Sequence, residues 1–462
     1  MSKLALRGGV RMKSLQDKIL GSWFGMAVGD AMGMAVKGLK PETVKQCFGS
    51  MDDFKDVRKF IGKGVKRYRM KGLYGAQTQR ALAVCDCVLK NKKSDVARIS
   101  DLFLELSANG PEIYYGAFRH VEGGFYQTVE SFPGRDPLIP ADLNHAGCSY
   151  PSLGIPIALF HQTDSSEMVR QCLDTGLLLT RNPMEVIGTF LTGYLVICFL
   201  SLEPTEDGEG LAQEQSRQLL EDAVNACERG ELILKQRFPE IEEASGEKIY
   251  QALRLTVQGT LERLDWEPGP LFDWICENAS AHGKNKITAP AQGHVLTLLP
   301  LALVMVLKGG NDFASVLTRS LNMGKESARL GTLVGAWAGA LYGFEGIPQH
   351  WKSGLVNSKE IRARGESLSQ RRAVKGLKNF VDMELALTNK EFEEGKKNLP
   401  KTMQKPSHKI SSGFDFHEDE FEESVIPKKE DAARRRKFQK DKTKMKRDRR
   451  RNLKLDFESD ED

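Results

Sequence analysis

Apolar residues recur at three- and four-residue intervals along most of the chain, from Leu15 to about Lys390. This spacing places them on one face of a helix, whereas the alternating pattern typical of strands is scarce. We therefore expect an all-α domain over residues 15–390. The predicted helices cover residues 17–33, 78–89, 95–106, 167–179, 184–202, 211–229, 248–264, 271–279, 295–307, 313–321 and 328–341.

Two apolar runs carry no charge and need comparison with membrane spans. Residues 186–202 are bounded by Glu185 and Glu203, without a basic or aromatic belt, and residues 295–307 are short and contain Pro300. A span needs about 20 apolar residues and usually has such a belt. We expect both runs to be buried core helices and predict no membrane partner.

Glycines repeat every four residues in two of the predicted helices. Each glycine inside a helix costs roughly 1 kcal/mol relative to alanine, so a row of them needs a compensating contact. Close approach of a second backbone is the usual compensation. We expect two neighbouring core helices that touch along these faces; two independent core helices are the open alternative. The rows are Gly21, Gly25, Gly29 and Gly33, and Gly331, Gly335, Gly339 and Gly343.

Composition limits the class of protein without fixing the number of domains. The chain has 462 residues, 40% of them hydrophobic, which is enough for one large core or two ordinary ones. Its eight cysteines are scattered without zinc-ligand spacing, as expected for reduced thiols inside a cell. Residues 1–14 are basic and lack an apolar segment, so we expect a flexible N-terminus; a transit peptide stays open.

The C-terminal part alternates blocks of like charge. Residues 415–423 are acidic, a basic run lies between Arg434 and Arg451, and the last residues are acidic. Such blocks cannot bury enough apolar surface to fold alone, so we expect residues 391–462 to be a disordered tail that is dispensable for stability. Residues 428–462 hold 15 basic and 9 acidic residues, a net charge of +6 against +5 for the whole chain. The folded part therefore offers no overall charge argument for binding nucleic acid.

The basic clusters of this tail indicate a partner and a location. Lys428 and Lys429 are followed, after four residues, by the run from Arg434 to Lys437. Two clusters at this spacing predict a nuclear import receptor as partner, and hence a nuclear and/or cytoplasmic location. The run up to Arg451 also has the charge to contact nucleic acid. A merely solvated charge run is the open alternative.

Six motifs follow one another along the chain: GSWFGMAVGDAMG, FGSMDDF, GLYGAQTQRALA, AGCSYPSLGIPIALF, LLTRNPMEVIG and GALYGFEGIPQHW. In this order they resemble the motifs of the ADP-ribosylglycohydrolase family. The resemblance covers about residues 17–351 and implies a single large orthogonal helical bundle with two magnesium ions at its centre. It also implies removal of ADP-ribose from modified arginine or serine side chains or related linkages.

The family's metal-binding acids are mostly absent here. Its Thr-Asp-Asp set falls on Gly75, Ala76 and Gln77, with Thr78 matching the next threonine. A loop glutamate of the family falls on Lys37.

The second acidic set of the family is Asp-x-Asp-Thr. It falls on Glu326, Ser327, Ala328 and Arg329, so only Glu326 keeps an acid. Positive charge from Lys37 and Arg329 would repel a dication, so we assign no metal ligand; magnesium is expected only if the family site is partly retained.

The resemblance also indicates where a ligand such as ADP-ribose or a related nucleotide would bind. The family binds diphosphate through backbone amides that match Gly147, Cys148 and Ser149. Lys37 and Arg329 would add positive charge. The other lining positions are Gln77, Thr78 and Ser327.

Plainer roles are open for the same side chains. Lys37 and Arg329 would then only neutralise Asp30, Glu326 or another acid. Asp30 itself would brace helix ends. A buried thiol is favoured over a nucleophile at Cys148, because His145 is the only candidate partner nearby.

Two functional hypotheses follow. YGAQT resembles the Tyr-Gly-Asp-Gln variant of the subgroup that includes jellyfish J1-crystallins and selenoprotein J, with Ala76 at the aspartate. This favours a pseudoenzyme with a binding or structural, crystallin-like role. The alternative is an active ADP-ribosyl hydrolase with a rebuilt site, in which Glu326 is the general base and Lys37 or Arg329 stabilises charge.

Overall fold

The computed structural model describes residues 13–205, 210–282 and 286–398, and these form an all-α domain. Within these residues the only β-type pairings are two isolated bridges, so the expected fold class is confirmed. Besides two short 3₁₀ helices, Arg58–Phe60 and Pro151–Leu153, the helices are α1 Leu15–Met34, α2 Pro41–Phe48, α3 Ala76–Asn91, α4 Val96–Ala108, α5 Gly123–Ser131, α6 Gly154–His161, α7 Ser166–Leu177, α8 Pro183–Ser201, α9 Gln213–Arg237, α10 Pro239–Ser245, α11 Glu247–Tyr250, α12 Ala252–Glu262, α13 Pro268–Ser280, α14 Val295–Lys308, α15 Phe313–Leu321, α16 Ser327–Tyr342, α17 Gln349–Gly354, α18 Ser358–Ser369 and α19 Phe380–Asn398.

The apolar spacing located the long helices well. Every predicted helical range lies on an observed helix, although residues 248–264 divide into α11 and α12. Of the helices that the pattern missed, α2, α5, α6, α10 and α17 have six to nine residues each, which gives too few repeats for a period to be recognised. The predicted ranges also missed two longer helices, α18 with 12 residues and α19 with 19 residues, both of which are rich in charged residues.

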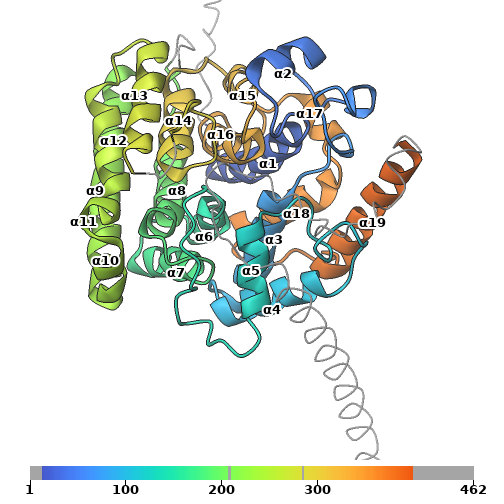
Figure 1. The fold of residues 1–462 in the computed structure, drawn as a ribbon, viewed down its shortest axis with the longest axis horizontal. Coiled ribbons are helices and arrows are strands. Elements are labelled where there is room, and N and C mark those ends of the chain that lie inside the picture. Colours follow the sequence, from blue (N-terminus) through green and yellow to red (C-terminus); the bar gives the residue numbers. More distant parts are fainter. Residues whose placement is uncertain (1–12, 206–209, 283–285, 399–462) are drawn as a thin grey trace, which may run out of the picture. The chain divides into compact units, whose positions relative to one another are not determined.

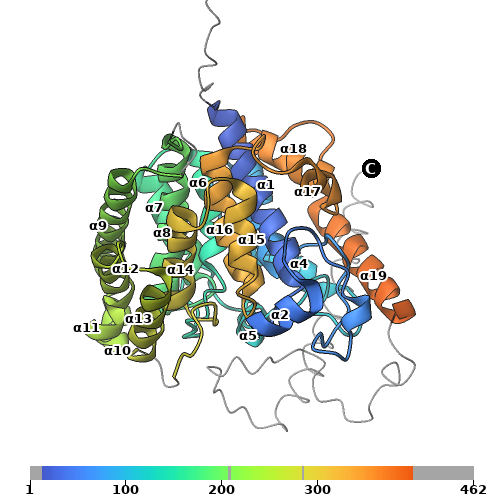
Figure 2. The ribbon, with the colours of Figure 1, turned by 90° about the horizontal axis from the view of Figure 1, so that it is seen from above.

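Helices α1 and α16 lie side by side at the centre of the domain (Figures 1 and 2). A Cβ atom on Gly29 would overlap the carbonyl oxygen of Gly331, and a Cβ on Gly25 would overlap that of Gly335. The two helices run antiparallel, because residues early in α1 meet residues late in α16. The expected contact between the two glycine faces is therefore confirmed.

Two details of this contact differ from the expected pattern. Gly343 lies outside the helix: it follows the end of α16 with a φ of 71°, a left-handed conformation that suits glycine, although its backbone still packs against Gly21. At the other end, Gly33 packs against the backbone of Ser327, whose Oγ donates to the Gly33 carbonyl at 2.8 Å. Ser327 thus joins the two helices.

The apolar runs are internal helices. Among the described residues, α8 is the one helix long and apolar enough to span a membrane, and 78% of its apolar window is buried. Neighbouring helices α6, α7, α9 and α16 cover it. Length and composition alone are weak evidence for a span, and this burial is that of a core helix.

The last helix continues beyond the expected end of the domain at Lys390. α19 runs to Asn398 and packs on α3 and α4. Glu391, which we expected to begin the tail, is 2% exposed and accepts hydrogen bonds from the Met70 amide and the Tyr114 hydroxyl, both at 2.9 Å. The boundary at residue 390 is therefore corrected to at least 398.

A second buried carboxylate fixes the same helix. Glu384 is fully buried and accepts from the Tyr74 hydroxyl at 2.6 Å, from Gln79 at 2.8 Å and from Arg119 at 2.7 Å. Tyr74 is the first residue of the YGAQT motif and Gln79 follows its last, so this region helps to hold α19 in place. Of the expected flexible N-terminus 1–14, residues 1–12 lie outside the described residues, as do the basic clusters from Lys428 to Arg451, whereas Ser14 caps α1.

We predict that a chain shortened to end at Lys390 melts several degrees below one that ends at Asn398, because the first loses the buried Glu391 contacts. The effect has a pH dependence. Burial raises the pKa of Glu391, but contacts with His120, Arg119 and the Met70 amide outweigh burial and lower this pKa to about 2. The contribution is then complete above the unfolded pKa near 4.5 and is lost as the pH falls toward 2. Thermal melts at pH 7 and pH 3 measure both effects; equal melting temperatures at pH 7 would contradict the prediction.

Candidate functional site

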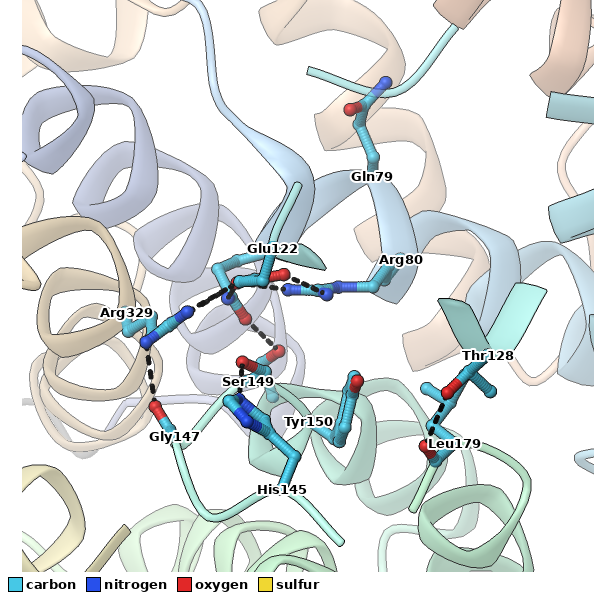
Figure 3. A network of polar contacts seen from close by, with 12 residues as sticks. Gln79, Arg80, Glu122, Thr128, His145, Gly147, Ser149, Tyr150, Leu179 and Arg329 are labelled. Carbon is cyan, nitrogen blue, oxygen red and sulfur yellow. Dashed lines mark hydrogen bonds and ion pairs between the residues drawn. The ribbon is translucent and has the colours of Figure 1, made fainter. Parts of the chain in front are cut away.

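The N-terminal ends of α3 and α16 meet at a buried cluster of ion pairs. Glu122, the residue before α5, lies between the guanidinium groups of Arg80 and Arg329 (Figure 3). Arg80 Nη1 donates to Glu122 Oε2 at 2.8 Å, and Arg329 Nη2 donates to Glu122 Oε1 at 3.0 Å. The side chains are 0%, 1% and 6% exposed for Arg80, Arg329 and Glu122. Three charges are thus held almost without water.

Electrostatics keeps Glu122 ionised. Burial raises its pKa, but the charges of Arg80, Arg329 and Lys37 outweigh burial and hold the pKa well below its usual range. The ring of Phe125 lies 4.9 Å from the Arg80 guanidinium and adds a cation–π contact. Arg329 is further fixed by donating from Nη1 to the Gly147 carbonyl at 2.9 Å.

Lys37 and Glu326 extend the cluster toward the surface. Lys37 Nζ lies 4.0 Å from Glu326 Oε2, and Arg329 Nη1 lies 3.4 Å from the same oxygen. Glu326 is 6% exposed, and its amide donates to the Ala291 carbonyl at 3.0 Å. The two expected cations therefore neutralise two acids, Glu326 and Glu122, and of these only Glu326 was anticipated.

Gln77 lies within this network, whereas Thr78 belongs to a separate capping contact. In the amide orientation that satisfies both ends, Gln77 accepts from Arg80 Nη2 at 2.7 Å and donates to the Ser149 carbonyl at 3.1 Å. Thr78 donates from its amide and hydroxyl to Asp30 Oδ2, at 2.9 and 2.8 Å. Burial raises the pKa of Asp30, and these hydrogen bonds oppose the increase. Asp30 therefore braces the start of α3, as the plainer reading expected.

The loop that we expected to bind diphosphate already holds a carboxylate of the chain itself. Glu185, in the first turn of α8, is fully buried and accepts from the Ser149 amide at 3.1 Å and the Tyr150 amide at 3.2 Å. Burial raises its pKa to about 7, opposed by bonds from these amides and that of Cys148. The Gly147 carbonyl accepts from Arg329. The amides of Ser149 and Tyr150 thus bind a carboxyl group of the chain itself, and the expected role of Gly147, Cys148 and Ser149 toward a diphosphate stays a prediction.

The nucleophilic groups of the same loop are closed to solvent. Cys148 is 3% exposed, and burial raises its pKa well above the usual value, so it remains a thiol. His145 Nε2 lies 3.1 Å from Ser149 Oγ, but Ser149 is fully buried. Burial, followed by the Arg329 charge, lowers the His145 pKa to about 4. A neutral, buried His–Ser pair without access for substrate orders the loop.

These residues do not fit a pair of magnesium ions. In residues 13–205, 210–282 and 286–398 no group of three or more His, Cys, Asp or Glu side chains could hold a metal. Gly75 and Ala76 offer no side-chain oxygen, and Asp30 is engaged by Thr78. Glu122 is already paired with Arg80 and Arg329, and the positive charges of these two side chains would repel a dication.

Sequence reasoning missed three members of the site. Arg80, Glu122 and Glu185 were not among the candidates, because only positions matching the metal ligands and the diphosphate loop of the resembled family were considered. A signal was present for Arg80, since it directly precedes the apolar stretch 81–85 of a predicted helix, and an arginine that is buried there requires a carboxylate partner. No local signal identifies which of the many acids is that partner.

Comparison with known proteins gives a consistent result. A family model described as ADP-ribosylglycohydrolase matches residues 11–378. A solved structure described as an ADP-ribosylglycohydrolase-related protein complex superposes with a TM-score of 0.54 at 20% sequence identity, covering 78% of this chain and 99% of that one. At this identity the likeness concerns the fold alone. The search of curated proteins gave no match.

Proposed function

Because this chain belongs to the ADP-ribosylglycohydrolase family, we propose that it is a non-catalytic member with a binding or structural role. One observation carries the proposal: Glu122 is clamped between Arg80 and Arg329, where the family resemblance places the metal centre. Guanidinium groups neutralise a carboxylate permanently, but they cannot activate a water molecule as a divalent ion does. The cluster supplies stability in place of turnover.

The state of the diphosphate loop favours the structural role over nucleotide binding. An ADP-ribose bound in the family manner would have to displace Glu185 from the amides of Ser149 and Tyr150. Displacement leaves a buried carboxylate without its donors, which is costly. We therefore propose a crystallin-like scaffold first and an ADP-ribose binder second. This proposal is compatible with the J1-crystallin-like subgroup resemblance of YGAQT.

The alternative, hydrolysis through a rebuilt site, would use Glu326 as general base. That carboxylate is shared between Lys37 and Arg329 and is only 6% exposed. A base must reach the proton that it removes, which these ion pairs oppose. No observation on the described residues favours this alternative.

Binding and turnover assays on the full chain test the proposal. We predict no heat of magnesium binding in isothermal titration, a melting temperature unchanged by magnesium or EDTA, and no release of ADP-ribose from Arg-, Ser- or acyl-linked substrates. A magnesium-dependent family member serves as positive control. Release that disappears in Glu326→Gln, while Glu345→Gln retains it, would establish the alternative and overturn the proposal.

The proposed location is nuclear and/or cytoplasmic, from the basic clusters alone. Replacing Arg434, Arg435, Arg436 and Lys437 by alanine in a fluorescent fusion tests it, since an unaltered distribution would remove the support.

A further inference from the structure

A strongly basic loop lies apart from the buried cluster. Residues 58–71 contain seven lysines and arginines and no acid, in the order RKFIGKGVKRYRMK. The folded part as a whole is nearly neutral, so its net charge does not reveal this local excess. A partner can use only those side chains that are exposed and make no ion pair.

The backbone of the loop is folded tightly, so the Cα atoms of its lysines have fixed positions. Ile61 and Val65 form an isolated bridge, and the Gly62 amide donates to the Val65 carbonyl at 2.9 Å. Gly62 and Gly64 have φ values of 80° and 112°, which glycine tolerates best. Lys63 therefore lies at the tip of a defined turn.

Three lysines of this loop remain available. Lys59, Lys63 and Lys66 are exposed, and within the described part of the chain no ion pair engages them. Arg58 is committed to Asp56, its Nε lying 2.9 Å from Asp56 Oδ1. Lys71 also lies near Asp56.

A small cleft of about 20 Å³ opens beside the loop. Its lining includes Lys37, Lys66 and Arg69 together with Gly38 and Gly64. Arg69 is bound to the Met34 carbonyl, so its guanidinium is held in place. A space of this size admits one water-sized group, such as one oxygen of a phosphate.

We propose that residues 58–71 and the Lys37 cleft form a binding surface for the phosphate backbone of a nucleic acid. Lysine ammonium groups neutralise phosphates as point charges, and several of them spread over one loop suit a chain of phosphates better than one small anion. Lys37 also pairs with Glu326 beside the Glu122 cluster, but none of the three exposed lysines touches that cluster, so replacing these lysines tests the surface without altering the proposed scaffold.

The aromatic residues of the loop indicate that contact is to the backbone and not to the bases. Phe60 packs edge-on against Phe48 at 4.7 Å between ring centroids. The Tyr68 hydroxyl donates to Glu394 of α19 at 2.8 Å. Both rings already contact other residues of the protein, so we do not expect them to stack on bases. The preference for particular base sequences should therefore be weak.

Fluorescence anisotropy with a labelled 12-nucleotide oligo-dT and the full chain tests this surface. The test variant is Lys59→Ala/Lys63→Ala/Lys66→Ala; the matched control, with the same change in charge, is Lys93→Ala/Lys359→Ala/Lys375→Ala at exposed sites elsewhere. Both are made in a chain with Arg434, Arg435, Arg436 and Lys437 replaced by alanine, which removes a basic cluster of the tail. Loss of three phosphate contacts should weaken binding roughly 100-fold at ~0.1 M salt and reduce the slope of log affinity against log salt by about 2.

Two outcomes would overturn the proposal. Equal affinity of the two triple variants would place any binding elsewhere. Equal binding of a labelled oligoglutamate of the same length would show that the surface accepts acidic chains in general and does not select phosphate. Tight binding of oligo-dT that only the loop variant loses supports it.

Discussion

Replacing Glu122 by glutamine should lower the free energy of unfolding by about 3 to 5 kcal/mol, the cost of leaving buried charge uncompensated. Without the carboxylate, the guanidinium groups of Arg80 and Arg329 face each other with almost no water to screen them. Chemical denaturation measures the change. Glu345 pairs with Lys352, but its own side chain is 82% exposed. Glu345→Gln should therefore change stability by less than ~1 kcal/mol.

The pH dependence separates lost charge from lost shape. The folded pKa of Glu122 lies well below its unfolded value, so its contribution is complete above about pH 4.3 and declines as the pH falls toward the folded pKa. The difference between Glu122→Gln and the original chain should therefore be greatest near pH 7 and shrink below pH 4.

A triple replacement tests whether charge is needed at all. Arg80→Met/Glu122→Leu/Arg329→Met keeps the volume approximately and removes every charge, so it should be far less destabilising than Glu122→Gln alone. A Glu122→Gln variant as stable as the original chain would show that the cluster is not a stabilising element, and the proposed function would lose its main support.

Replacing Gly29 by alanine should destabilise the domain by more than ~3 kcal/mol or prevent its folding. The new Cβ would overlap the carbonyl oxygen of Gly331, a backbone atom that cannot move away as a side chain can. Separating α1 from α16 would disturb the remaining glycine contacts as well, beyond the usual 1 to 3 kcal/mol of overpacking.

Gly269→Ala is the matched control. Gly269 lies in the first turn of α13, and a Cβ there has no neighbouring atom within 4 Å. Alanine favours helix, but Pro270 follows and disfavours the helical conformation of a residue that carries a Cβ, so the two effects oppose each other and this variant should stay within about 1 kcal/mol of the original chain. Circular dichroism melts and soluble yield compare the two variants; a Gly29→Ala chain that melts with Gly269→Ala would refute close packing at this position.

The sequence by itself determined most of the helices and the central pair. Apolar residues recur every three or four positions along a helix, so the bounds of helices such as 313–321 were located to the residue. The two glycine rows predicted their own contact, because both carry the same spacing and each requires a close backbone. These signals are local and are repeated several times along one element.

The tertiary structure alone decided the chemistry of the site. Glu122 and Arg329 are 207 positions apart, and no periodic pattern links two such residues. The same holds for Glu185, which reaches the amides of Ser149 and Tyr150, and for Glu391, which extends the domain past its expected end. A buried charge selects its partner by distance in space and by exclusion of water, and both exist only once the helices have packed.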